Sequence, residues 1–161
     1  MTSGKTLYHS MQHAFDYAPV LDTAVRESGI SREEAASLFD GLLQWLSVIP
    51  SARNGQPVQM VGSIDQLWHA FVLNTKLYRT FCDRFFGRHI DHDPLDRFDQ
   101  ELSKKQYARF TLATLRQEFG DDVHPAFVDL AQQVTCCYGQ CDDGGGIVAL
   151  AAGASEVRDS Q

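Results

Sequence analysis

The sequence has no long hydrophobic run and few basic residues. Of its 161 residues, 14 are Lys or Arg and 21 are Asp or Glu, so the formal net charge is −7. Binding to a phosphate backbone needs a basic surface, and this balance therefore excludes nucleic acid as the expected partner. Because no segment approaches the roughly 20 apolar residues of a membrane-spanning helix, no membrane partner is expected either.

The N-terminal residues also lack the apolar stretch of a secretory signal peptide. A cytoplasmic location is therefore the expectation. The chain is long enough for one domain with a sizeable core and too short for two of ordinary size. Its hydrophobic content of 43% and charged content of 22% are typical of a soluble globular protein.

Several catalytic motifs are missing as well. The three glycines at 144–146 have neither the preceding strand nor the following helix of a phosphate-binding loop. The chain has no Gly-x-Ser-x-Gly nucleophile elbow. A Cys–His nucleophile pair stays open, because a sequence does not show which residues meet in space.

Apolar residues recur at helical spacing over most of the chain. A capping box, Ser31 with Glu34, opens one helix, and Pro50 stops it. Another helix begins again near Pro19, since proline is tolerated in a first turn. The predicted helices cover 8–28 with an interruption at Pro19, 31–49, 63–86, 95–119 and 125–134. We therefore predict an all-α fold, one domain of five or six helices over 1–141, followed by a disordered glycine-rich tail over 142–161.

The residues most suggestive of chemistry lie at the two ends of the predicted helix 63–86. Asp65 and His69 are four residues apart, so their side chains share one helical face and could share one partner. His92 follows Gly87, which ends this helix. The helix would be ~30 Å long at 1.5 Å per residue. His92 therefore reaches His69 only if the loop folds back; otherwise later helices must bring another ligand.

Two interpretations of these residues stay open. Asp65 and His69 could be metal ligands, or Asp65 could fix the tautomer of a ligating His69. Alternatively, Asp65 only favours the positive end of the helix dipole and His69 is a boundary residue. His92 could likewise belong to a surface turn with local hydrogen bonds to its neighbours.

Three of the four cysteines, Cys136, Cys137 and Cys141, fall within six residues. In a reducing compartment such a cluster is more often a metal or redox site than a disulfide. The three residues between Cys137 and Cys141 are compatible with the spacing of zinc ligands. Reduced thiols without a metal are the alternative.

The motifs Asp65-x-x-Trp68-His69 and Gly87-x-x-Ile-Asp-His92, followed by the cysteine cluster, resemble the glycine-rich domain-containing protein family of plants and fungi. The resemblance covers residues 60–141 and implies that Asp65, Trp68, His69 and His92 occupy the motif positions of that family. It implies no established reaction. Fungal members often carry a second His where this chain has Phe71, and their cysteines tend to be spaced Cys-x-Cys-x-x-Cys.

We therefore predict a small soluble metal-binding helical protein, with zinc as the metal. The predicted ligands are Asp65, His69, His92, Cys136, Cys137 and Cys141. One alternative is a metal-free helical module that binds a protein partner, with Trp68 and the histidines as core and boundary residues. A second is a metal- or thiol-dependent enzyme, which needs an open coordination position or a cysteine of low pKa.

Overall fold

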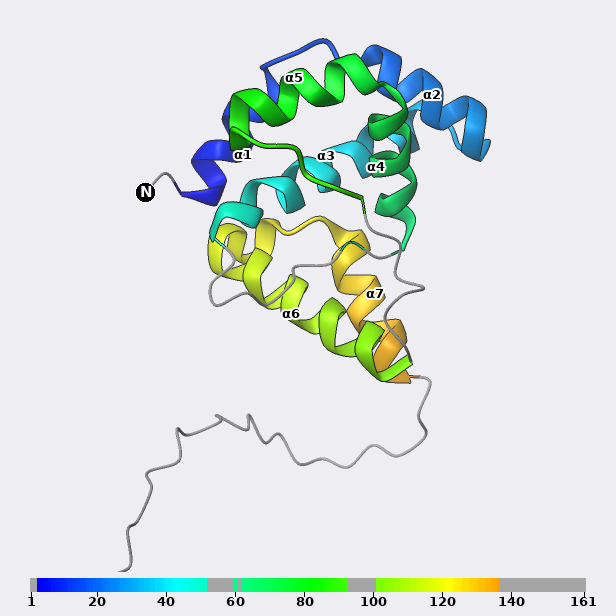
Figure 1. Ribbon diagram of the computed structural model, residues 1–161. Coiled ribbons are helices and arrows are strands. Elements are labelled where there is room, and N and C mark those ends of the chain that lie inside the picture. The colour runs from blue at the N-terminus through cyan, green and yellow to red at the C-terminus, as the bar shows by residue number, and fades with distance from the viewer. Residues whose placement is uncertain (1–2, 52–59, 61, 93–100, 137–161) are drawn as a thin grey trace, which may run out of the picture.

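The computed structural model describes residues 3–51, 60, 62–92 and 101–136, without the side chains at 51, 101–107, 130 and 132–136. Within these ranges the chain is helical and contains no strand, which confirms the all-α prediction (Figure 1). The predicted tail, 142–161, lies outside the described residues. The helices are α1 (Gly4–Gln12), α2 (Ala18–Ser28), α3 (Arg32–Val48), α4 (Ser63–Leu73), α5 (Thr75–Phe86), α6 (Glu101–Phe119) and α7 (Pro125–Cys136).

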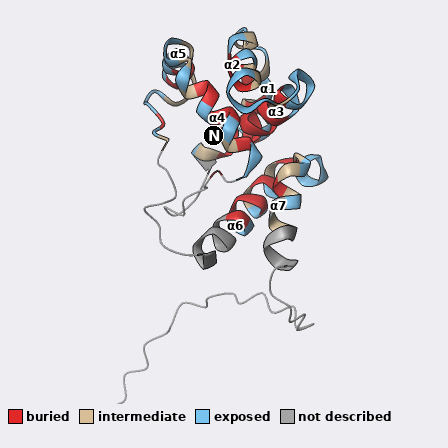
Figure 2. Cartoon of the chain, turned by 90° about the vertical axis from the view of Figure 1, so that its right-hand side faces the viewer, coloured by how far each residue is buried: buried red, intermediate tan, exposed pale blue. Residues whose placement is uncertain are grey.

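Helix α3 is the central element of the fold. Every residue from 41 to 48 is buried, because α1, α2, α4 and α6 all pack against this helix. A helix that is apolar around most of its circumference is expected to be enclosed in this way. The predicted cap is confirmed, since the Ser31 hydroxyl accepts a hydrogen bond from the backbone N–H of Glu34 at 3.1 Å. Figure 2 shows the buried faces of α3 and α4 turned toward each other.

The segment predicted as one helix over 63–86 is two helices that meet at a sharp corner (Figure 1). Asn74 separates α4 from α5 with a non-helical backbone, φ −81° and ψ 58°. Its side-chain N–H groups donate to the Ala70 carbonyl at 2.9 Å and to the Thr23 hydroxyl of α2 at 3.0 Å. The break between α4 and α5 is therefore stabilised by a residue outside 63–86, Thr23 of α2. Helix α4 begins at Ser63, with Gly62 as its N-cap residue.

Helices α6 and α7 form a pair on one side of the body made by α1–α5 (Figures 1 and 2). A short 3₁₀ turn, η4 (Gly120–Asp122), lies between them. The Glu118 carboxylate of α6 accepts a hydrogen bond from the Gly4 backbone N–H at 2.8 Å and so caps α1. None of the helices described here is long and apolar enough to cross a membrane.

Candidate functional site

The Asp65-x-x-Trp68-His69 motif contacts the segment that follows α5. This segment, residues 87–92, is called the return loop below. The Nε2 atom of His92 lies 3.0 Å from Oδ1 of Asp65, which is a hydrogen bond between the return loop and the first turn of α4. The corner at Asn74 makes this contact possible, since a straight helix would carry His92 away from Asp65. The requirement that the loop fold back is thus met.

His69 lies next to this pair without a hydrogen bond to it. Its ring centroid is 5.3 Å from that of His92, with the two rings nearly perpendicular at 89°. Across 3–51, 60, 62–92 and the described part of 101–136, no group of three or more His, Cys, Asp or Glu side chains could hold a metal ion. The three predicted ligands in this region are therefore a bonded pair with a neighbour, not a group arranged around one point.

The predicted cysteine ligands fall at and beyond the end of the described residues. Cys136 is the last residue of α7, and its side chain, like Cys137 and Cys141, lies outside the described residues. Helix α7 starts below α4 and runs away from it in Figure 1. The part of the chain that is described thus gives the predicted cysteine ligands no link to Asp65.

Trp68 is a structural residue of the motif. It is buried, and its indole N–H donates to the Tyr78 hydroxyl at 3.0 Å. That hydroxyl in turn donates to the Ile90 carbonyl of the return loop at 2.6 Å. The Trp68 ring also contacts His92, with centroids 4.4 Å apart. One indole and one phenol therefore connect α4, α5 and the return loop.

Two further aromatic residues, Tyr78 and Trp45, belong to this cluster. Tyr78 was recognisable from the sequence only as a core position, because its bond to Ile90 depends on how the chain turns back. Trp45 of α3 packs on Trp68 with ring centroids 4.7 Å apart. Its indole N–H is buried and has no hydrogen-bond partner among the described residues. Nothing in the sequence signals this contact.

The thiol of Cys82 does not favour nucleophilic chemistry. Cys82 is a free cysteine that is fully buried in α5. Burial raises the pKa of this thiol above its usual range, although the Ile90 backbone and Tyr78 oppose the effect. A reactive cysteine needs the opposite, a lowered pKa and access to solvent. Cys82 is therefore a core residue.

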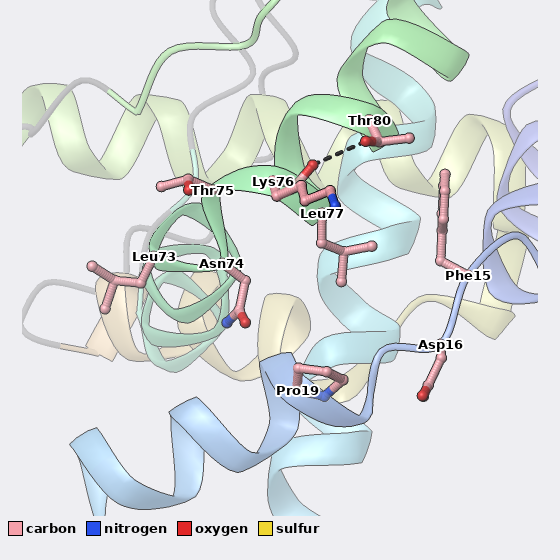
Figure 3. A pocket seen from close by; sticks show the side chains of 9 residues that line it. All are labelled: Phe15, Asp16, Pro19, Leu73, Asn74, Thr75, Lys76, Leu77 and Thr80. Atoms are coloured by element: carbon pink, nitrogen blue, oxygen red, sulfur yellow. Dashed lines mark hydrogen bonds between the residues drawn. The ribbon is translucent and has the colours of Figure 1, made fainter.

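A second candidate site is an open groove beside the α4–α5 corner (Figure 3). It has a volume of about 690 Å³, within the usual range for ligand sites. Two separate segments form it: residues 15–19, where the connection after α1 enters α2, and residues 73–80 around the corner. Its lining residues are Phe15, Asp16, Pro19, Leu73, Asn74, Thr75, Lys76, Leu77 and Thr80.

The groove combines exposed apolar surface with fixed polar groups. Leu73 is 55% exposed, which is unusual for a leucine at the end of a well-packed helix. Asp16 accepts a hydrogen bond from the Ala18 N–H at 3.0 Å, and the Thr80 hydroxyl donates to the Lys76 carbonyl at 2.9 Å. Figure 3 shows Leu77 pointing into the space between Phe15 and Pro19. The walls of the groove are thus held by bonds inside the protein.

A family model described as UCP032817-like matches residues 9–124. The chain belongs to the UCP032817-like family. In this UCP032817-like protein the match takes in α2–α5 and the return loop, and it ends before α7 and the cysteine cluster. No curated protein and no solved structure matches the chain.

The resemblance to the glycine-rich domain-containing protein family is therefore wrong, because the family match is to UCP032817-like proteins. The motif on which that resemblance rested, Asp65-x-x-Trp68-His69 with His92, has a structural explanation in this chain. Asp65 and His92 bond the return loop to α4, and Trp68 bonds α4 to α5. Residue types that satisfy packing needs of this kind can recur without a shared origin.

Proposed function

We propose that this UCP032817-like protein is a helical interaction module that binds an apolar segment of a protein partner in the groove beside the α4–α5 corner. The observation that carries the proposal is the groove itself, with Leu73 55% exposed at its edge. Exposed apolar surface gathered in a concave site is characteristic of a binding site, whereas single exposed leucines on convex surface are ordinary.

The geometry around the groove supports this proposal. The bonds from Trp68 to Tyr78 and from Tyr78 to Ile90 fix how α5 leaves α4. Asn74 bonds the corner to α2. A groove with fixed walls loses little conformational entropy when a partner binds.

The charges at the groove suggest one feature of the partner. Lys76 lies in the first turn of α5, where the positive end of the helix dipole also lies. A carboxylate next to the apolar residue of the partner would be favoured there. Asp16 also lines the groove and would repel a carboxylate. The partner is thus an apolar segment whose adjacent acidic residue lies beside Lys76 and away from Asp16.

Leu73→Asp should weaken binding of such a segment at least tenfold. Burying a leucine side chain contributes about 1.5–3 kcal/mol, and 1.4 kcal/mol corresponds to a factor of ten. Peptides that bind the full chain would first be selected from a displayed random library. Their dissociation constants would then be measured by calorimetry. Phe110→Asp is the matched control, since Phe110 is 44% exposed on α6 and lies outside the groove. Equal binding by Leu73→Asp and the wild type, or no selectable peptide, would contradict the proposal.

Zinc binding is the second candidate function. It is supported by the bond between His92 Nε2 and Asp65 Oδ1 and by the adjacent His69 ring, since zinc takes imidazole nitrogen and carboxylate oxygen. Further ligands would have to come from Cys136, Cys137 or Cys141.

Elemental analysis of protein purified without chelator tests the zinc proposal. About one zinc per chain, lost in His92→Ala, would support a site that includes His92. Zinc retained in His92→Ala but lost when the three cysteines become serine would place the metal on the cysteines alone. Protein that contains no zinc would overturn the proposal. In that case His69→Ala should change neither the metal content nor the stability.

A cytoplasmic location is also proposed. It is supported by Cys82, which is a free thiol, because unpaired cysteines are usual in reducing compartments. Fractionation of the source cells with an antibody to the protein tests it, and recovery from the culture medium would contradict it.

A further inference from the structure

His124 occupies the junction at which the α6–α7 pair meets α3. It lies between η4 and α7, and its half-buried ring sits against Gly41 of α3. A Cβ atom at Gly41 would lie 2.9 Å from Cγ of His124, so only glycine admits the ring at this distance. The ring makes two hydrogen bonds. Its Nε2 atom is 3.0 Å from the Ser37 hydroxyl of α3, and its Nδ1 atom is 3.3 Å from the Ala126 backbone nitrogen of α7.

These two bonds determine the tautomer of His124. The Ala126 N–H can only donate, so Nδ1 of His124 must accept and carries no proton. In the neutral imidazole the proton is then on Nε2, which donates to the Ser37 hydroxyl. The ring therefore acts as the side-chain cap for the first turn of α7 and at the same time as a bond to α3. The cap requires the neutral form, whereas the Nε2–H bond to Ser37 is kept when the ring is protonated.

We propose that His124 is a pH-sensitive latch whose protonation releases the first turn of α7, while the ring stays bonded to α3 through Ser37. A proton on Nδ1 would point at the Ala126 N–H, which ends the cap and places two donors face to face. The released turn carries the apolar side chain of Phe127, which is buried in the latched state. Acid thus loosens the start of α7 and uncovers this side chain.

The charges around the ring set the pH at which the latch opens. Burial lowers the pKa of His124 below its usual value of 6.5, and Asp40 of α3 and Asp129 of α7 oppose this effect without cancelling it. The latched state therefore binds a proton less readily than the released state. Its stabilisation is fully present above pH 6.5 and is lost as the pH falls through the lower, latched-state pKa.

Other bonds keep the opening local. Gly4 of α1 donates to Glu118 of α6 at 2.8 Å, and Lys5 of α1 forms an ion pair with Asp122 at 3.1 Å. Neither of these bonds involves His124. The α6–α7 pair would therefore remain attached through α1, and through Gln44 of α3, while the first turn of α7 opens.

Native-state hydrogen exchange of the full chain, followed by mass spectrometry at pH 7.5 and pH 5 and corrected for intrinsic rates, tests the latch. In the wild type the amides of the first turn of α7 should lose at least about tenfold protection at the lower pH, which corresponds to a modest local opening free energy. The amides of α3 and α4 should not. His124→Asn keeps an acceptor near Nδ1 that does not titrate, so its α7 protection should be independent of pH. His9→Asn, on an exposed face of α1, is the matched control and should behave as the wild type.

Three outcomes would overturn the proposal: pH-independent protection of α7 in the wild type, an equal loss in His124→Asn, or a uniform loss in every helix. If His124→Asn does not fold, an NMR titration of the histidine ring protons supplies the second test. The midpoint of the His124 titration must lie below the usual histidine pKa of 6.5 and coincide with the midpoint of the exchange profile. A mismatch between the two midpoints overturns the latch.

Discussion

Tyr78→Phe should lower the free energy of unfolding by about 3 kcal/mol, a large loss for the removal of one oxygen atom. The hydroxyl accepts from Trp68 at 3.0 Å and donates to the Ile90 carbonyl at 2.6 Å, and Tyr78 is only 1% exposed. Without it, an indole N–H and a backbone carbonyl remain in the interior with no partner. Each unsatisfied buried group costs about 1–3 kcal/mol. Urea unfolding followed by tryptophan fluorescence and circular dichroism measures the loss.

Tyr17→Phe is the control for this substitution. Tyr17 is also largely buried, but its hydroxyl makes a single hydrogen bond, to the Met11 carbonyl at 2.6 Å. We expect a loss of about 1 kcal/mol there. Equal losses in the two variants would mean that the Trp68 indole finds another partner, and that the relay from α4 to the return loop does not stabilise the fold.

The same substitution should also loosen the return loop. Ile90 and His92 are the residues that bond this loop to Tyr78 and to Asp65. Amide protection in the return loop should therefore fall more than protection in α3. The groove depends on the same relay, since it fixes the corner that carries Leu73. Peptide binding in the groove should weaken in Tyr78→Phe and stay unchanged in Tyr17→Phe at a temperature where both are folded.

Local signals in the sequence were sufficient to predict where several helices begin or end. The Ser31 hydroxyl and the Glu34 N–H are three residues apart, and their bond needs no other part of the chain. Gly87 ends α5 with φ 63°, a conformation in which glycine meets no steric penalty. Pro19 lies in the first turn of α2, as expected where an N–H is not required.

The corner at Asn74 could not be predicted in the same way. The apolar stripe continues from α4 into α5 without a change of period, so the pattern indicated one helix. What stabilises the break is a bond from Asn74 to Thr23, fifty-one residues earlier in the chain. Tertiary contacts of this kind override local propensity. The contact of Asp65 with His92 depends on the break, and the groove is formed by two segments more than fifty residues apart. Neither was therefore accessible from spacing alone.

Gln44 is the other residue whose substitution should lower the free energy of unfolding strongly. It lies in the middle of α3 and is 5% exposed. Its side chain binds backbone groups of Asp122 and His124. Its amide N–H donates to the Asp122 carbonyl at 3.0 Å, and its amide oxygen accepts from the His124 N–H at 2.9 Å. One side chain thus satisfies a donor and an acceptor of the short connection between α6 and α7.

Gln44→Met should lower the free energy of unfolding by about 3 kcal/mol, because it keeps the length of the side chain and removes both bonds. Ser47→Ala is the matched control on the same helix. Ser47 is fully buried, but its hydroxyl makes only a local bond to the Gln44 carbonyl at 2.7 Å, and about 1 kcal/mol should be lost. Urea unfolding measures both, and a loss in Gln44→Met no greater than in Ser47→Ala would mean that water replaces the amide.

A double-mutant cycle then tests whether Gln44 and His124 hold one unit. Both fasten the segment between α6 and α7 to α3, Gln44 through its amide and His124 through Ser37. If the segment opens as a unit, the losses in Gln44→Met and His124→Asn should be less than additive by at least 0.5 kcal/mol, roughly the smallest coupling that such cycles resolve. Additive losses would mean that each bond opens separately. In that case acid would release the start of α7 while Gln44 still held Asp122, and the opening would be confined to the cap.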